Sequence, residues 1–283
     1  MSWLPPGPAM LFCPADRPER YTKAAERSDV VIVDLEDAVA PANRPAAREA
    51  VIASRLDPAR TIVRVNPVGT DDHEPDLGAV AHTDYRVVML AKTESAEQVR
   101  AVAARGLQVL ALVETPLGVV RAAEIAAEAG CVGLMWGAED LVAGMGGSTS
   151  RFAADEAAAH CRPPHSYRDV PRYARSAVAL AAAAFGKWAV DSVHLDIADT
   201  AGQRAEAVDA VALGYAATAC IHPSQVQVVR EAYAPTADEV AWARRVLDAA
   251  KDNPGVFQLD GRMIDAPVFR QAEATLRRAG SSS

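Results

Sequence analysis

The sequence lacks any long hydrophobic run. No stretch of its 283 residues reaches the roughly 18 uninterrupted apolar residues that a membrane-spanning helix needs. The longest candidate, AVALAAAAF from Ala177, is expected to be a buried helix. The N-terminus, MSWLPPGPAM, has neither the basic region nor the apolar core of a signal peptide. We therefore expect a cytoplasmic protein that does not engage a membrane.

Cysteine is also scarce, with four in the chain. Their spacing suggests neither a disulfide framework nor a zinc site. Cys13, Cys131 and Cys220 fall inside apolar runs, where a buried cysteine behaves as a small hydrophobic residue. The cysteines therefore indicate reduced thiols.

Positive charge is in deficit as well. The formal net charge is −8 and there is no long basic run, which argues against a nucleic-acid partner. A small anionic substrate stays compatible with this charge, because local arginine and lysine side chains can override the net sign.

What the sequence does contain is eight short apolar runs, most of which end in an ionisable or amide side chain. The runs are AMLFCP (from Ala9), VVIVDLED (Val30), TIVRVN (Thr61), RVVMLAK (Arg86), QVLALVET (Gln108), CVGLMWGAED (Cys131), WAVDSVH (Trp188) and AATACIHP (Ala216). Such runs are typical of strands buried on both faces of a parallel sheet, and nearly every segment between them has helical spacing. The pattern predicts a (β/α)₈ TIM barrel with its active site at the carboxyl ends of the strands.

The length fits one barrel of about 250 residues with a short extension. We predict the barrel over residues 1–233 and a C-terminal helical extension or lid, part of the same domain, over residues 234–283. Thr236 and Glu239 predict a capping box that opens a helix of this extension. The connection from Gly144 to Tyr173 is much longer than the others and is predicted to be a long loop over the barrel mouth.

Acidic side chains gather at three predicted strand ends. Closure of a barrel brings such ends together, where uncompensated carboxylates would repel one another. Oxygen ligands without a nearby His or Cys favour Mg²⁺, with Mn²⁺ as the other possibility. We choose Glu114 and Asp140 as the direct ligands; the alternative is a solvated Glu114 and helix capping by Glu139 and Asp140. The three clusters are Asp34, Glu36 and Asp37; Glu114; and Glu139 with Asp140.

Two cations end neighbouring strands. Arg64, in RVN, is suited to clamp a substrate carboxylate, or forms an ion pair with Glu36 and Asp37; both can hold, since Glu36 could orient Arg64. Lys92, in LAKTE, would form a Schiff base only if burial lowered its pKa, and an ion pair with a strand-end carboxylate is the favoured alternative. His194 and His222 are expected to be hydrogen-bonded structural residues, because no second His or Cys shares ligand spacing with either.

Several strings together resemble the citrate lyase β-subunit-like branch of the aldolase/citrate lyase family, with its malyl-CoA and citramalyl-CoA lyases. The resemblance runs from about Leu11 to Ala279 in the expected order. It implies a magnesium-dependent barrel enzyme, a homotrimer or hexamer, that makes or breaks carbon–carbon bonds in 3-hydroxyacyl thioesters. The strings are LFCPADRPERYTKAAERSDVVIVDLEDAVAPANRPAAREAV, TIVRVNP, ALVETPLGV, WGAEDLVAGMGG, DSVHLDIADTAG, ACIHPSQV, APTADEVAWARRVL and GRMIDAPVF.

The resemblance also implies roles for individual residues. Glu114 and Asp140 would hold the metal, and Arg64 would bind the substrate carboxylate and oxygen. Asp265, in MID, would be the acid–base group, commonly supplied by a neighbouring protomer. Two further pairs are implied, Glu36 and Asp37 as acceptors for metal-bound water and Arg64, and Gly137 and Ala138 as contacts to the substrate.

The expected reaction is cleavage of a 3-hydroxyacyl-CoA, of the citramalyl-CoA, malyl-CoA or 3-hydroxy-3-methylglutaryl-CoA type, into an oxo acid and a short acyl-CoA. The alternatives are a metal-dependent aldolase acting on free 2-oxo acids and a lyase subunit acting on an acyl-carrier-protein thioester. The chain departs from the family where Arg-Ser and Gly-Lys are frequent. These positions, here Pro8–Ala9 and Ala217–Thr218, lie where a CoA phosphate is expected.

Overall fold

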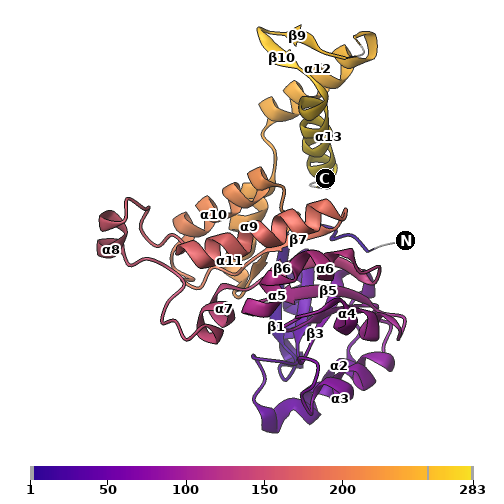
Figure 1. Cartoon of the computed structure of the whole chain (residues 1–283). Coiled ribbons are helices and arrows are strands. Elements are labelled where there is room, and N and C mark those ends of the chain that lie inside the picture. Colours follow the sequence, from indigo (N-terminus) through magenta and orange to yellow (C-terminus); the bar gives the residue numbers. More distant parts are fainter. Residues whose placement is uncertain (1–2, 254, 282–283) are drawn as a thin grey trace. The chain divides into compact units, whose positions relative to one another are not determined.

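The computed structural model, which describes residues 3–253 and 255–281, contains a closed barrel of eight parallel strands (Figure 1). Each strand pairs with the next along the chain, and β8 pairs with β1. The strands are β1 (Ala9–Pro14), β2 (Val30–Asp34), β3 (Thr61–Val65), β4 (Val87–Leu90), β5 (Gln108–Val113), β6 (Cys131–Trp136), β7 (Trp188–Asp191) and β8 (Ala217–Cys220). Every strand lies within a predicted apolar run, so the predicted (β/α)₈ TIM barrel is confirmed.

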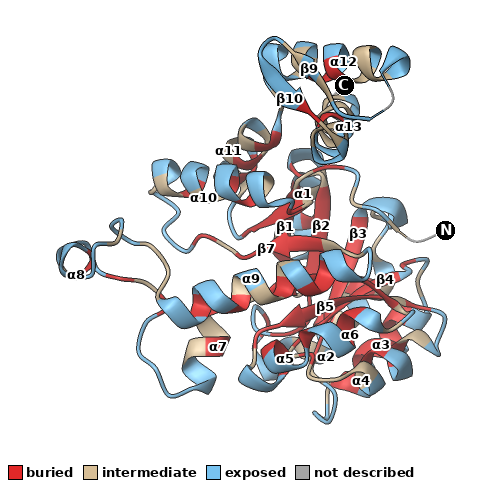
Figure 2. Ribbon diagram, turned by 45° about the horizontal axis from the view of Figure 1, so that its top comes forward, coloured by how far each residue is buried: buried red, intermediate tan, exposed pale blue. Residues whose placement is uncertain are grey.

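Helices connect the strands, and Figure 2 shows buried strands beside helices whose outer faces are exposed. Their bounds are α1 (Tyr21–Arg27), α2 (Arg44–Ala53), α3 (His73–Ala81), α4 (Ala96–Ala103), α5 (Pro116–Val120), α6 (Ala122–Ala127), α7 (Ala138–Gly144), α8 (Ala154–Ala159), α9 (Asp169–Ala184), α10 (Thr200–Leu213) and α11 (Pro223–Tyr233). The run AVALAAAAF lies in α9, which is amphipathic: Val178 and Ala181 are buried but Leu180 is exposed. The prediction of a buried helix was therefore right for one face only. In the described part of the chain, no helix combines the length and apolarity needed to cross a membrane.

Apolar side chains from all eight strands fill the barrel. Neighbouring strands place similar side chains at equal height, as with Ile32 beside Ile62 and Met89 beside Leu110. A side chain at Gly133 would place its Cβ 2.6 Å from the Trp188 ring, so this position requires glycine. The buried cluster is Met10, Val30, Ile32, Ile62, Val87, Met89, Leu110, Leu112, Val132, Met135, Val190, Ala217 and Ala219.

The long connection between β6 and β7 is more ordered than the sequence predicts. It contains α7 and α8, and α9 already begins at Asp169, so Tyr173 is helical. Between α7 and α9, Arg151 and Tyr167 form an antiparallel bridge. The predicted loop from Gly144 to Tyr173 is thus too long, because its polar second half starts a helix.

The cysteines are thiols, as predicted. Cys13, Cys131 and Cys220 are buried in strands, whereas Cys161 is exposed in the connection after α8. Burial raises the pKa of Cys13 and that of Cys131 to about 11.

The chain divides into two compact units, Met1–Val229 and Arg230–Ser283. The second unit holds α12 (Ala237–Asp252), the antiparallel hairpin of β9 (Phe257–Leu259) and β10 (Arg262–Ile264), and α13 (Ala266–Ser281). Thr236 and Glu239 form the capping box of α12, as predicted. The domain boundary at residue 233 and the role of the extension as a lid stay predictions.

The hairpin was not predicted. Its turn is Asp260–Gly261, with φ of +49° and +78°. An Asp-Gly pair in this conformation is typical of the two-residue turns that join antiparallel strands. The dipeptide was therefore a usable signal within the C-terminal segment.

Candidate active site

A cavity of about 420 Å³ lies at the carboxyl ends of the barrel strands. Most of the predicted site residues line this cavity. One side of its lining is polar and carries carboxylates and Arg64, whereas Phe12, Leu112, Met135, Val193, Leu195 and Ile221 are apolar. The predicted residues among the lining are Asp37, Arg64, Glu114, Gly137, Ala138 and Asp140.

Arg64 is held by the end of the neighbouring strand. Its Nε and Nη2 each donate to one oxygen of Asp34, both at 2.6 Å. Asp34 also accepts the backbone N–H groups of Glu36 (2.9 Å) and Ala38 (3.1 Å). Burial opposes the charge of Arg64, but the Asp34 carboxylate outweighs it and raises the pKa of the guanidinium. Arg64 is therefore a fixed cation whose remaining nitrogen, Nη1, is free of Asp34.

Glu36 lies between two cations. Arg64 Nη1 is 2.9 Å from its Oε2, and Lys92 Nζ bonds its Oε1. Lys92 Nζ also lies 3.3 Å from Asp140 Oδ1. Burial of Lys92 lowers the pKa of its ammonium, but the hydrogen bond to Glu36 and the nearby Glu114 raise it by more. The ion-pair interpretation of Lys92 is confirmed, and a neutral lysine ready to form a Schiff base is not favoured.

Glu114 is a deeply buried carboxyl group of the cavity. It follows β5, is 4% exposed, and accepts the backbone N–H of Lys92 at 3.1 Å. Burial, and then the charge of Asp140, raises the pKa of Glu114 to about 8. Burial and the charge of Asp140 therefore both favour a proton on Glu114, or a bound cation beside it.

Asp140 and Gly137 lie at the start of α7. Gly137 precedes the helix, and a Cβ there would lie 2.8 Å from both Cβ and Oε2 of Glu114. The absence of this side chain leaves room beside Glu114. Among the described residues no three His, Cys, Asp or Glu side chains form a metal cluster. Two carboxylates still suit Mg²⁺, which keeps several waters and takes few protein ligands.

A buried network that was not predicted from the sequence fixes the ends of β2 and β3. Asn66 Nδ2 donates to Leu35 O (2.9 Å) and to Asp76 Oδ2 (2.7 Å). Asp76, on α3, also accepts Arg48 Nε at 2.7 Å. The strand-end asparagine of RVN was the available signal. The network keeps the loop that carries Glu36 beside the strand that carries Arg64.

Three predicted residues are engaged elsewhere. Asp265 belongs to the second unit, where its Oδ1 accepts Val268 N at 3.4 Å, and its acid–base role stays a prediction. His194 Nδ1 bonds Glu206 and His222 Nδ1 bonds Ser224, so both histidines are hydrogen-bonded, as expected.

The two departures from the family pattern lie together. Ala9 pairs with Thr218 in the β1–β8 ladder, and Thr218 N donates to Pro8 O at 2.8 Å. Both sites that lack the frequent cation therefore belong to one seam of the barrel.

Known proteins resemble the chain over nearly its full length. A citrate lyase subunit beta-like protein of Mycobacterium tuberculosis is 55% identical over 277 residues, which cover 98% of this chain and 97% of that protein. A crystal structure of the protein CitE from M. tuberculosis in complex with magnesium, acetoacetate and coenzyme A is 55% identical, with a TM-score of 0.87 over 97% of this chain and 98% of that chain. A complex of CitE with magnesium and pyruvate is 50% identical, with a TM-score of 0.80 over 96% and 98%.

Family comparisons agree with these structures. Residues 176–281 match a family described as carbon–carbon bond lyases of the TIM-barrel fold. Residues 8–223, which include every strand of the barrel, match HpcH/HpaI aldolase/citrate lyase. The chain therefore belongs to the HpcH/HpaI aldolase/citrate lyase family.

Proposed function

We propose that this protein is a Mg²⁺-dependent lyase that cleaves a 3-hydroxyacyl-CoA thioester into an oxo acid and a short acyl-CoA. The main observation behind the proposal is that Arg64, Glu114 and Asp140 line the same cavity. When bound, Mg²⁺ would be held by Glu114 and Asp140 and would polarise the substrate oxygen.

Among the candidate substrates, we favour 3-hydroxy-3-methylglutaryl-CoA. Cleavage of its C2–C3 bond gives acetoacetate and acetyl-CoA, and a relative that is 55% identical binds acetoacetate, coenzyme A and magnesium together. Citramalyl-CoA would give pyruvate, which the same relative also binds with magnesium. Malyl-CoA would give glyoxylate, and its product lacks the methyl group that the apolar lining near Leu112 and Met135 would contact.

The residues of this chain divide the work of the cleavage. The 3-hydroxyl loses its proton and becomes the keto group, and the electrons of the C2–C3 bond form a thioester enolate that then takes up a proton at C2. Arg64 Nη1 lies 2.9 Å from Glu36 Oε2 and does not bind Asp34; one of its two N–H groups would donate to the oxygen that becomes the ketone. Glu36 would keep Arg64 and Lys92 in place, and Asp37 and the backbone of Gly137 and Ala138 would face the substrate.

Asp265 would protonate the enolate. This role rests on the family resemblance, because Asp265 lies in the second unit.

The test is a substrate panel. Purified protein is assayed with 3-hydroxy-3-methylglutaryl-CoA, citramalyl-CoA and malyl-CoA, with Mg²⁺, with Mn²⁺ and with a chelator. We expect the highest kcat/KM for the first thioester, activity with either metal and none with the chelator. Turnover that is unaffected by the chelator would contradict the proposal.

A second candidate is a metal-dependent aldolase acting on free 2-oxo acids, favoured by the pyruvate complex of the relative. Cleavage of a free 4-hydroxy-2-oxo acid faster than any thioester would establish it. Because Lys92 is paired with Glu36, borohydride should trap no adduct in either case. An acyl-carrier-protein thioester turned over in place of the CoA thioesters would indicate a subunit of a larger lyase.

A further inference from the structure

A short segment between α7 and α8 reaches two sides of the active-site cavity. Ser150 Oγ donates to Glu139 Oε1 at 2.6 Å, and Glu139 is the neighbour of Asp140 in the cavity lining. Arg151 binds Glu206, on α10, through both terminal nitrogens, with Nη2 3.1 Å from Oε2. Adjacent residues therefore contact the β6 side and the helix that follows β7.

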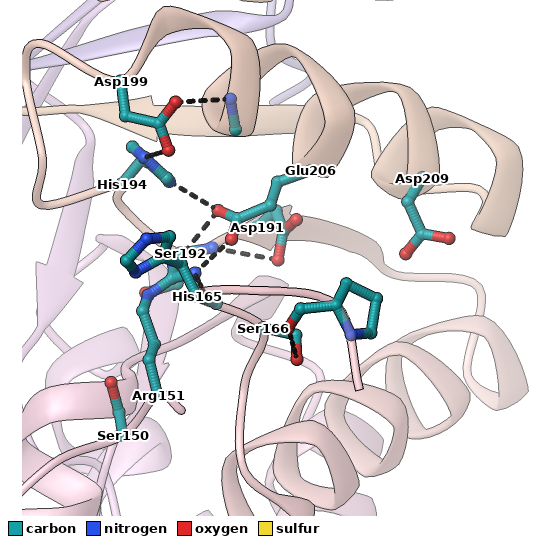
Figure 3. Close-up of polar contacts among 12 residues, drawn as sticks. Ser150, Arg151, His165, Ser166, Asp191, Ser192, His194, Asp199, Glu206 and Asp209 are labelled. Carbon is teal, nitrogen blue, oxygen red and sulfur yellow. Dashed lines mark hydrogen bonds and ion pairs between the residues drawn. The ribbon is translucent and has the colours of Figure 1, made fainter. Parts of the chain in front are cut away.

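Glu206 also contacts His194, in the segment that follows β7. Its Oε2 lies 2.9 Å from His194 Nδ1, so Arg151 and His194 share one carboxylate (Figure 3). Burial opposes the ionisation of Glu206, but hydrogen bonds from His194 and Arg151 outweigh it and hold the pKa of its carboxyl below the usual range. Both contacts are therefore charge-assisted at neutral pH.

His194 stands behind a wall of the active-site cavity. Its side chain is buried against Glu206, and Nε2 is 3.4 Å from Asp199 Oδ2. Its backbone oxygen accepts Gln225 Nε2 at 2.7 Å, and Gln225 Oε1 accepts Ile221 N at 2.8 Å. The residues of this stretch that line the cavity are Ser192, Val193 and Leu195. The wall is thus held by hydrogen bonds to Glu206 and Gln225, which do not line the cavity.

The segment that carries Arg151 is itself anchored. Arg168 N donates to Ser150 O at 2.8 Å, and Arg151 donates to the backbone oxygen of His165 at 2.9 Å. The guanidinium also stacks over the Tyr167 ring, 3.8 Å from its centroid. Arg151 is therefore fixed on one side before it reaches Glu206 on the other.

We propose that Arg151 is a positioning residue, which holds the β7 wall of the cavity through Glu206 and His194, and that Ser150 holds Glu139 on the adjacent, β6 side. The inference rests on the proposed lyase function, whose substrate would contact this wall. The two neighbours should affect different ligands. Arg151 governs the fit of the oxo acid, and Ser150 governs the Mg²⁺ end of the cavity.

The experiment compares Arg151→Gln and Ser150→Ala by calorimetric titration with Mg²⁺, and then with acetoacetate in saturating Mg²⁺. For Arg151→Gln we expect acetoacetate affinity to fall about tenfold while Mg²⁺ affinity stays within about twofold. For Ser150→Ala we expect Mg²⁺ affinity to fall by about tenfold, as when other groups that orient metal ligands are removed. Steady-state assays should show the first change as a raised KM with a smaller loss of kcat.

Three further variants exclude a general loss of structure. Arg151→Lys, which keeps one charge for Glu206, should lie between the wild type and Arg151→Gln. Glu206→Gln should cause a smaller loss when added to Arg151→Gln than when made alone, because Arg151 acts on the wall through Glu206. Arg162→Gln is the matched control, since Arg162 lies in the same connection but pairs with the exposed Asp169. It should behave as the wild type.

The outcomes separate the two proposals. If Arg151→Gln and Ser150→Ala shift both affinities alike, or neither, the positioning role is wrong even where the enzyme cleaves its thioester. If the two affinities separate as expected but no thioester is cleaved, the positioning role stands and the lyase proposal fails.

Discussion

The two carboxylate groups of the cavity are stabilised in opposite ways. On the β2–β4 side, Asp34 and Glu36 are buried and paired with Arg64 and Lys92. On the β5–β6 side, Glu114 is similarly buried, and this burial, together with the charge of Asp140, raises its pKa to about 8. The first group contains its own counterions and forms part of the fold. In the second group Lys92 lies 3.3 Å from Asp140, but the charges of Lys92 and Arg64 do not offset the burial of Glu114. A buried carboxyl group in this condition is expected of a site that receives a cation.

The largest effect is expected from removal of a cation on the β2–β4 side, where the carboxylates are paired. Arg64→Ala leaves Asp34 and Glu36 buried without their main cation, which should cost about 3–5 kcal/mol of unfolding free energy. Turnover should also fall by at least about 10²–10³. Urea denaturation in chelator and kcat/KM with Mg²⁺ measure the two losses.

The contrasting variant is Asp140→Asn. Its side chain is 38% exposed, so stability should change by less than about 1 kcal/mol while turnover still collapses. If Arg64→Ala and Asp140→Asn destabilised the protein equally, the β2–β4 and β5–β6 sides would not differ in how their carboxylates are stabilised.

A smaller effect concerns pH. The pKa of Glu114 is about 8 in the folded protein and roughly 4.3 in the unfolded chain. Between these values the folded, metal-free protein holds a proton that the unfolded chain has released, so stability falls as pH rises, by a few kcal/mol in all. Glu114→Gln should remove this fall. The measurement is the free energy of unfolding in chelator across this range, with Glu124→Gln, on the exposed face of α6, as the control.

If the free energy of unfolding depended on pH in the same way for the wild type and Glu114→Gln, the pKa of Glu114 would not be raised in the folded protein. The comparison between the two sides would then lose its physical basis.

The smallest effect tests the space beside Glu114. Gly137→Ala would push its Cβ to 2.8 Å from Oε2 of Glu114, so this carboxylate must shift. We expect Mg²⁺ affinity to fall about tenfold, measured by calorimetry, with little change in stability. Gly144→Ala, at the other end of α7, is the matched control, because its Cβ would meet Pro116 Cδ at an ordinary 3.6 Å. Equal Mg²⁺ affinities in the two variants would contradict this expectation.

The barrel could be predicted because its strands are continuous apolar runs between helical segments. The convergence of Arg64, Glu114 and Asp140 followed from it, since closure brings the strand ends together. Which carboxylate Arg64 selects could not be predicted. Asp34 and Glu36 lie close to each other at the end of the same strand. Only the register of β2 against β3, which pairs Asp34 with Arg64, decides between them.

Contacts that depend on tertiary geometry could not be predicted from the sequence. Nothing in the sequence distinguishes Asp76 from the other acidic residue of α3, yet Asp76 is fully buried against Asn66. Arg151 lies in a stretch rich in glycine, serine and proline, which suggested an open loop instead of a residue anchored to α10. Asn66 is 10 residues from Asp76 and Glu206 is 55 residues from Arg151, and each partner lies in another element, so no spacing within one helix or strand signals the pair.

Cys161 makes this protein convenient to study without further engineering. It is the exposed cysteine of the four and sits in the connection that carries Arg151, whereas burial keeps the thiols of Cys13 and Cys131 protonated at neutral pH. A maleimide fluorophore would therefore attach selectively at Cys161 in the native sequence. Its emission would follow the connection while Mg²⁺ and substrate bind, in real time and in solution.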